Sequence, residues 1–351
     1  MSDVSFGIFD HIERTSGGAR LHELYDERLG LMEAADRAGF WCYHVAEHHA
    51  TPLGMAPSPS LLLAAAAQRT RRMRLGALVY LLPFYQPLRL VEEICMLDNL
   101  TGGRLEVGVG RGVSPFELGH HRIPFYTTRN IYNEAMEVIV KGLRNERLTH
   151  SGRLYEYDNV PMELRPMQSP HPAFWYGIIS DDSTAYAARL GMNVVSLGPD
   201  ELVKRLSAVY RATGRDRAAD LNPHVERPRV GALRHIVIAD DEREAEQLAR
   251  DAYRVFYDNA QKLWRDFLTI VLAFTPDYDA ALKQGTLMVG TPPSVREQVG
   301  RFFDESGCDY LVLSFAWGNL SAAQARRSLD AFASGVMPEF AGRRSDRSYP
   351  R

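Results

Sequence analysis

The sequence Phe-Trp-Cys-Tyr-His-Val-Ala-Glu-His-His occupies residues 40–49 and decides the fold. Its apolar, aromatic run ends abruptly at Glu47, His48 and His49. A short strand with ionisable groups at its carboxyl end is typical of barrel enzymes, which keep their chemistry there. The same residues could cap a helix or bind a metal, but adjacent histidines point to opposite sides of a strand, and a zinc protease helix needs H-E-x-x-H. The stretch therefore predicts a strand that ends in candidate catalytic residues, among them Glu47 and His48, and a helix cap or a metal pair is the alternative.

Short apolar runs alternate with helical patterns on both sides of this stretch. We predict strands at residues 4–9, 41–46, 74–82, 105–109, 173–178, 193–197, 230–239 and 310–315. Each is followed by a segment with helical spacing or a helix cap, such as 21–38 and 128–143. Since no G-x-G-x-x-G follows the first strand, a dinucleotide-binding sheet is disfavoured. The pattern predicts one α/β domain over residues 1–340, a (β/α)8 TIM barrel with insertions.

Three segments depart from this rhythm. Residues 151–167 alternate in polarity, which predicts a hairpin insertion at about 150–167. Residues 262–285 have no clear pattern, so about 260–288 is a candidate lid. Residues 341–351 are predicted to be a basic, solvated C-terminal tail.

The composition narrows the function classes. The chain has 351 residues and a formal net charge of -3, so no electrostatic footprint for nucleic acid is present. No apolar run approaches the roughly 18 residues of a membrane span, and the N-terminus lacks a signal-peptide layout. The three cysteines, Cys42, Cys95 and Cys308, are far apart in apolar contexts, which indicates buried thiols in a reducing compartment. We expect a cytoplasmic enzyme.

Two loops that follow predicted strands have features of a phosphate site. Gly110-Arg111-Gly112 would let backbone N–H groups approach an anion, with Arg111 as a guanidinium fork. A helix that opens at Ser180, Ser183 and Thr184 would offer free N–H groups and hydroxyls. A tight turn and ordinary N-capping explain the same residues separately. Because both loops would lie on one barrel face, together they favour a planar cofactor with a single phosphate.

Four aromatic side chains are candidates for the wall of a substrate pocket. They are Tyr80, Phe84, Trp175 and Trp317. The alternative is that some of them fill the hydrophobic core, which is the commoner use of aromatic residues.

Several long motifs, all in one order, resemble the bacterial luciferase-like (alkanal monooxygenase-like) flavin monooxygenase family. They include Ala-Glu-His-His at 46–49, Leu-Pro-Phe-Tyr-Gln-Pro at 82–87 and Gly-Gly-Arg-Leu-Glu-Val-Gly-Val-Gly-Arg-Gly at 102–112, with further matches at 74–76, 97–98, 289–292 and 328–332. The resemblance covers residues 6–340. It implies a barrel enzyme that binds FMN reduced by a separate NAD(P)H-flavin reductase. O2 would add at the flavin C4a carbon, and the C4a-peroxyflavin would oxidise a small organic substrate such as an aldehyde or a ketone.

The resemblance also implies roles for individual residues. His48 matches the catalytic histidine, whose imidazole can pass a proton at neutral pH, and Glu47 would help to orient that region. Arg111, between Gly110 and Gly112, matches the partner of the FMN phosphate, with Ser180, Ser183 and Thr184 completing the site. Leu78-Val79 matches a non-proline cis peptide beneath the flavin. A homodimer formed through the apolar faces of the early helices is implied as well.

The sequence departs from the light-emitting subunit of that family at two positions. That subunit has a reactive cysteine where this chain has Gly110 and a glutamate where it has Ile179, so we do not expect bioluminescence. The resemblance leaves open an F420-dependent dehydrogenase or reductase that moves a hydride without O2, with Arg122 and Arg129 near its longer anionic tail. A non-catalytic flavin-binding protein is the third alternative.

Overall fold

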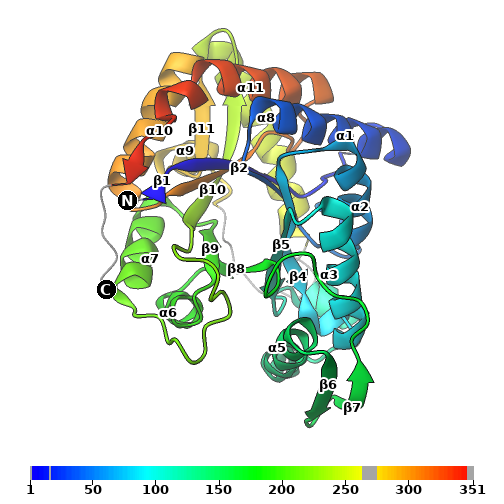
Figure 1. The fold of residues 1–351 in the computed structure, drawn as a ribbon. Coiled ribbons are helices and arrows are strands. Elements are labelled where there is room, and N and C mark those ends of the chain that lie inside the picture. Colours follow the sequence, from blue (N-terminus) through cyan, green and yellow to red (C-terminus); the bar gives the residue numbers. More distant parts are fainter. Residues whose placement is uncertain (1, 16, 263–274, 346–351) are drawn as a thin grey trace.

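The computed structural model describes residues 2–15, 17–262 and 275–345. Eight parallel strands close into a barrel, as predicted, and helices surround it (Figure 1). In the order of their pairing they are β2 (Ser5–Asp10), β3 (Cys42–Val45), β4 (Arg74–Leu81), β5 (Leu105–Gly110), β8 (Ala173–Ile178), β9 (Asn193–Ser196), β10 (Val230–Ile238) and β12 (Tyr310–Ser314). Pairing of β12 with β2 and of β10 with β9 closes the ring.

A ninth parallel strand, β11 (Leu287–Gly290), pairs with the C-terminal half of β10. It lies beyond Val230–Ala232, the part of β10 that pairs with β9. The sequence patterns did not predict this strand, because four apolar residues between two helices give too short a periodic signal.

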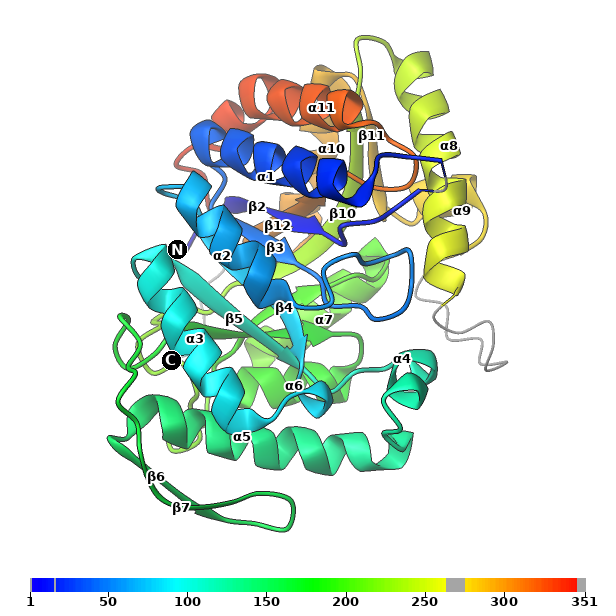
Figure 2. The same ribbon diagram turned by 90° about the vertical axis from the view of Figure 1, so that its right-hand side faces the viewer.

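Helices connect the strands and cover the outside of the barrel (Figure 2). They are α1 (Leu21–Ala38), α2 (Pro59–Arg69), α3 (Pro87–Thr101), α4 (Pro115–His120), α5 (Thr128–Arg144), α6 (Asp181–Arg189), α7 (Asp200–Ala212), α8 (Glu242–Gln261), α9 (Tyr278–Lys283), α10 (Pro292–Ser306) and α11 (Ala322–Gly335), with short 3-10 turns at Leu82–Phe84, Phe125–Thr127 and Met337–Phe340. Helix α3 illustrates the local signals, since it begins at Pro87 and is capped after Thr101 by Gly102, whose φ of 66° suits glycine.

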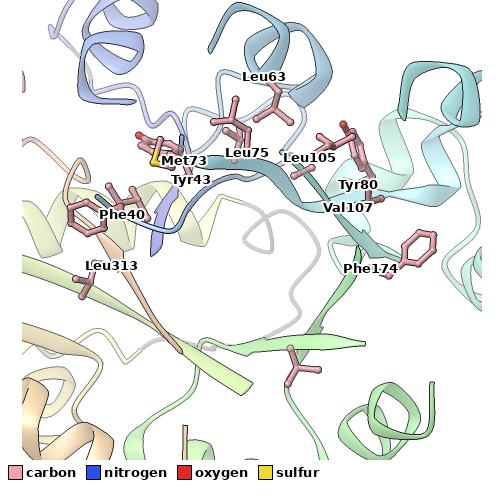
Figure 3. Packing of buried hydrophobic residues seen from close by; sticks show 14 of the residues in the cluster. Phe40, Tyr43, Leu63, Met73, Leu75, Tyr80, Leu105, Val107, Phe174 and Leu313 are labelled. Carbon is pink, nitrogen blue, oxygen red and sulfur yellow. The ribbon is translucent and has the colours of Figure 1, made fainter. Parts of the chain in front are cut away.

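Strand alternation divides the buried side chains into two layers. Tyr43 and Val45 of β3 point outward and join the main core between the barrel and the helices, which Figure 3 shows around Leu63 and Leu75. His44 and Ala46 point into the barrel, where Phe9, Leu233 and Val312 also lie. The alternation continues beyond β3, so the inward face of this strand leads from His44 and Ala46 towards His48.

The three irregular segments differ from their predictions in detail. The hairpin consists of β6 (Arg147–Ser151) and β7 (Glu156–Pro161), so it starts earlier than predicted. Residues 263–274 of the candidate lid lie outside the described residues, and its later part contains α9 and the start of β11. The C-terminal tail is not wholly free, because β13 (Arg344–Ser345) pairs with β1 (Ser2–Asp3) in an antiparallel ladder. Cys42, Cys95 and Cys308 are buried free thiols, as predicted.

No helix within the described part of the chain is both long and apolar enough to cross a membrane.

Candidate active site

His48 lies just beyond the carboxyl end of β3, where its ring contacts a carboxylate from a distant helix. Its Nδ1 is 3.1 Å from Oε1 of Glu117, and that same oxygen accepts a 2.7 Å hydrogen bond from the backbone N–H of His49. Glu117 belongs to α4, whose N-cap Ser114 and first residue Pro115 are typical helix-start signals. Gly54 lies close against His48, since a Cβ there would be 2.8 Å from the His48 Cβ. Two loops and one short helix therefore fix the position of this imidazole.

Glu47 turns away from His48. Its Oε1 is 2.9 Å from Nε2 of His49, and its Oε2 accepts hydrogen bonds from the Leu81 N–H and the Tyr85 hydroxyl, at 3.1 and 2.9 Å. Burial raises the pKa of Glu47, and these hydrogen bonds act in the opposite direction. The structure thus places Glu47 in contact with the segment that carries His48, but not with the His48 side chain.

The sequence analysis missed two further histidines in this region, His11 beside His48 and His235 near His11. The ring of His11, just beyond β2, stacks on that of His48 with centroids 5.6 Å apart. Burial, followed by the nearby His48 and His235, lowers the pKa of His11 well below its ordinary value. His235 of β10 packs on Phe256, and burial lowers its pKa to about 3. His11 and His235 are therefore neutral at physiological pH and offer hydrogen bonds rather than charge.

Asp10, at the C-terminal end of β2, points to the outside of the barrel. It is buried, accepts a 2.6 Å hydrogen bond from the Tyr43 hydroxyl and lies 3.2 Å from Nε of Arg28. Glu13 comes to the C-terminal face instead, where it accepts hydrogen bonds from Asn259 and from the Gly318 N–H. Burial raises the pKa of Glu13 to about 7.

The glycine-rich end of β5 packs against an irregular part of β4. The peptide bond between Leu78 and Val79 is cis, as predicted, and the pairing of β4 with β5 shifts register between Ala77 and Tyr80. A Cβ at Gly110 would be 2.5 Å from the Val79 side chain. Gly110 is therefore required by packing, in addition to any role in binding.

Arg111 follows directly and has no hydrogen-bond or ion-pair partner within residues 2–15, 17–262 and 275–345. Its charge and that of Arg129 act on Tyr176 of the neighbouring strand β8. The next residue, Gly112, has a φ of 72°, the left-handed conformation that glycine adopts at least cost. An unpaired cation thus lies at a sharp turn at the end of β5.

The hydroxyls at the start of α6 mainly cap that helix. Ser180 accepts from the Ser183 N–H at 3.3 Å, and the Ser183 hydroxyl accepts from the Ser180 N–H at 3.1 Å. Thr184 is fully buried, and its hydroxyl donates to the Ser180 carbonyl. The prediction that Thr184 contacts a phosphate directly is therefore wrong for its hydroxyl. Ser180 is exposed at the helix N-terminus, and Ser183 is half-buried there.

The predicted aromatic wall is only partly on this face. Phe84 is there, in contact with the rings of His49 and His121. Tyr80 is wrong as a wall residue, because it is buried in the outer core (Figure 3). Its hydroxyl bonds to that of Ser60. Trp175 is also wrong, since it fills the barrel interior against Trp41.

Trp317 lies near the face but is buried. Its ring packs against His235, and its N–H donates to the Ile236 carbonyl. It supports the histidine rather than offering a free surface.

Two cavities lie away from these residues. One of about 480 Å³ is lined by α7, α9, β11 and α10, and one of about 610 Å³ lies by the N-terminal end of β2. Neither cavity is lined by a predicted site residue. The candidate site is therefore identified by the ionisable side chains gathered at the strand ends rather than by cavity volume.

Glu117 and His11, which the sequence analysis did not identify as site residues, have only weak signals in the sequence. Ser114 and Glu117 have the S-x-x-E spacing of a capping box, but nothing in the spacing indicates that Glu117 reaches across to His48. His11 follows a predicted strand by two residues, a position in which a barrel enzyme can use it.

Comparison with known proteins gives a consistent result. Residues 4–310 match the model of the luciferase-like monooxygenase family. An uncharacterized Sinorhizobium fredii protein, y4wF, is 40% identical over 91% of this chain and 92% of its own length. The oxygenase component of the flavin-dependent trigonelline monooxygenase of Acinetobacter baylyi is 28% identical, with 99% and 98% coverage.

Solved structures share the fold. The monooxygenase RslO1 from Streptomyces bottropensis has a TM-score of 0.83 at 28% identity, covering 96% of this chain and 99% of its own. At lower identity the likeness shows the fold alone. The oxygenating constituent of 3,6-diketocamphane monooxygenase from Pseudomonas putida, in complex with FMN, has a TM-score of 0.79 at 21% identity (96% and 99% coverage). The F420-dependent tetrahydromethanopterin reductase from Methanopyrus kandleri has 0.72 at 17% (97% and 100%). The family match over most of the chain and the closed barrel agree, and the chain belongs to the luciferase-like monooxygenase family.

Proposed function

We propose that the protein is the oxygenase of a two-component monooxygenase, which uses reduced FMN and O2 to oxidise a small organic substrate such as an aldehyde or a ketone. A separate NAD(P)H-flavin reductase would supply the reduced FMN. The observation that carries the proposal is Arg111, a guanidinium without a partner among the described residues, on the same barrel face as His48. The trigonelline relative, an oxygenase component by name, supports the two-component arrangement.

The residues on this face fit FMN. Arg111 can form charge-assisted hydrogen bonds to a phosphate, and the N-terminus of α6, with Ser180 exposed and Ser183 half-buried, favours an anion. Leu78 and Val79 line the barrel interior with Phe9 and Ala46, which suits an apolar ring system. One phosphate and one planar ring would therefore each find a complementary surface.

Bound reduced FMN would supply two electrons, so that one atom of O2 enters the substrate and the other leaves as water. The chain's own contribution is positional and acid–base. The apolar side chains around Leu78 and Ala46 limit access of water to this face from the barrel interior. His48 has the side chain that holds or moves a proton at this face, since an imidazole changes charge near neutral pH.

The direct test is isotopic. Purified protein, a flavin reductase, NAD(P)H and FMN would be incubated under ¹⁸O2 with aldehydes, ketones and N-methylated pyridine carboxylates. We expect one ¹⁸O atom per product molecule, with NAD(P)H consumed in proportion. A product without label from O2, or failure of the protein to bind reduced FMN, would contradict the proposal.

His48→Ala tests the acid–base role in the same assay. Removing a general acid–base group costs about 10²–10⁴-fold in rate, and we expect product formation to fall within that range while reduced FMN still binds. Unchanged turnover in this variant would remove His48 from the mechanism.

The F420-dependent alternative uses the same barrel and predicts hydride transfer without O2 uptake. A non-catalytic flavin-binding protein would bind FMN and oxidise no substrate in the panel. The ¹⁸O assay separates both from a monooxygenase.

We also propose a homodimer formed through the neighbouring helices α2 and α3. Their side chains Leu61, Met96 and Leu100 are 75%, 54% and 47% exposed, which is unusual for large apolar residues on one pair of helices. A monomer mass in sedimentation equilibrium would contradict this arrangement.

A further inference from the structure

We propose that Glu117 is a positioning residue that holds the His48 proton on Nδ1, so that Nε2 is the nitrogen that gives and takes a proton at the barrel face. The use of Nε2 in turnover rests on the proposed function, whereas the tautomer itself does not.

The geometry around one oxygen atom carries the inference. Oε1 of Glu117 is 3.1 Å from Nδ1 of His48 and 2.7 Å from the N–H of His49. An ionised carboxylate only accepts hydrogen bonds, so Nδ1 must be the donor. Nε2 of His48 has no partner in the described part of the chain, and the side chain is 22% exposed. The buried carboxylate thus fixes one nitrogen and leaves the other available.

The position of Glu117 in its helix points in the same direction. It is the third residue of α4, and Ser114 caps the helix by accepting from the Glu117 N–H at 3.4 Å. A glutamate at this position commonly folds back to the N-cap backbone. Here both hydrogen bonds recorded for its carboxylate go to the segment that follows β3, more than 60 residues away. The side chain therefore serves His48 rather than its own helix terminus.

The other ionisable groups around His48 do not compete for this role. His11 stacks on His48, and its neighbour His235 packs on Phe256, both as buried neutral imidazoles. Glu47 is bonded to His49, Leu81 and Tyr85 on the outward side. Glu117 is consequently the one carboxylate bonded to the His48 ring among the described residues. A buried carboxylate at Nδ1 is a known means of holding an imidazole in one tautomer.

The test is ¹⁵N NMR of histidine-labelled protein without flavin or substrate, with His48→Gln used to assign the His48 signals. In the wild type at alkaline pH we expect the neutral His48 to be protonated at Nδ1. In Glu117→Gln we expect it to move towards the Nε2–H form, which free imidazole favours. Nε2–H in the wild type, or the same tautomer in the wild type and Glu117→Gln, would overturn the proposal. The wild-type result decides the matter even if the variant does not fold.

Glu134→Gln is the matched control. Glu134 lies 3.5 Å from Nε2 of His150 at the distant hairpin, so this variant should change the His150 signals and leave those of His48 unaltered. In turnover, Glu117→Gln should lower kcat by about 10–100-fold, the loss seen when a partner that orients a metal-bound imidazole is removed, with reduced FMN affinity unchanged. Because the NMR experiment needs no cofactor, its failure is distinct from failure of the proposed function.

Discussion

Among single side chains, Arg111 gives the sharpest prediction about the cofactor. Hydrogen bonds to charged groups contribute about 1.5–3 kcal/mol, so Arg111→Ala should weaken binding of reduced FMN by about 10–100-fold. Reduced riboflavin lacks the phosphate, and its affinity should not change. Fluorescence titration of both flavins under anaerobic conditions measures the difference.

Arg153→Ala is the control for this substitution, because Arg153 is an exposed arginine at the hairpin tip. It should bind both flavins as the wild type does. An equal loss of FMN and riboflavin affinity in Arg111→Ala would place the guanidinium away from the phosphate.

The sequence placed some residues correctly and others on the wrong side of a strand. His48, Arg111 and Phe84 lie at strand ends, as the alternation of elements predicted. Tyr80 does not, because the register shift between Ala77 and Tyr80 turns both Leu78 and Val79 to the interior and sends Tyr80 outward. Simple alternation from Leu78 would have turned Tyr80 inward.

The sequence also did not predict how deep in the barrel a side chain lies or which distant residue it contacts. Trp175 does point inward, but it pairs with Gly108 and Asn193 below the strand ends, too deep to line the face. The bond between Glu117 and His48 joins residues 69 positions apart. Local spacing carries no information about such a contact.

At the scale of the elements, close packing of β5 on β4 predicts different costs for two glycines. Gly110→Ala would place a Cβ 2.5 Å from the Val79 side chain, whereas Gly177→Ala on β8 meets nothing within 4 Å. Overpacking usually costs 1–3 kcal/mol. We therefore expect Gly110→Ala to lower the free energy of unfolding by about 1–3 kcal/mol and Gly177→Ala to change it by less than about 1 kcal/mol.

Urea denaturation of the two variants beside the wild type measures this difference. Equal free energies of unfolding would mean that the Val79 side chain can move aside at little cost and that Gly110 is not needed for packing.

Elements with strong signals were predictable, and short elements were not. The helical spacing at 21–38 and 128–143 located α1 and α5 to within one residue. Helices α4 and α9 have six residues each, and β11 has four. A six-residue helix contains less than two turns, and a four-residue strand gives only two repeats of its alternation. Tertiary contacts rather than local sequence therefore determine whether such short elements form.

For the whole molecule, buried histidines predict loss of stability in acid. Burial lowers the pKa of His44 and of His235 to about 3 and that of His171 to about 4, from 6.5. Below about pH 6.5 the unfolded chain binds protons that the folded chain does not, so stability falls as pH decreases towards 4. Glu13, with a pKa raised to about 7, opposes this trend because its protonation favours the folded state. The combined effect of the three imidazoles on the free energy of unfolding exceeds that of the one carboxyl group.

The free energy of unfolding should therefore be lower at pH 5 than at pH 7. His44→Gln should reduce the slope by up to about 1.4 kcal/mol per pH unit, the value for one proton. Equal stability at the two pH values, or parallel curves for the wild type and His44→Gln, would contradict this reading of the buried histidines.

The barrel as a whole was the most predictable feature. Eight apolar runs, each followed by a helical pattern, leave few arrangements that bury both faces of a parallel sheet. What closes the barrel is the pairing of β12 with β2, more than 300 residues apart, and such pairing follows from the complete set of strands rather than from any one of them.

The central claim is that this barrel face binds reduced FMN for reaction with O2. The most direct test is anaerobic titration of the wild-type protein with reduced FMN and, separately, with reduced F420, each followed by admission of air. We predict tight binding of reduced FMN, weak or no binding of F420, and an absorbance change on contact with O2 that free reduced FMN does not show. Preferential binding of F420, with no effect of the protein on the reaction with O2, would contradict the account.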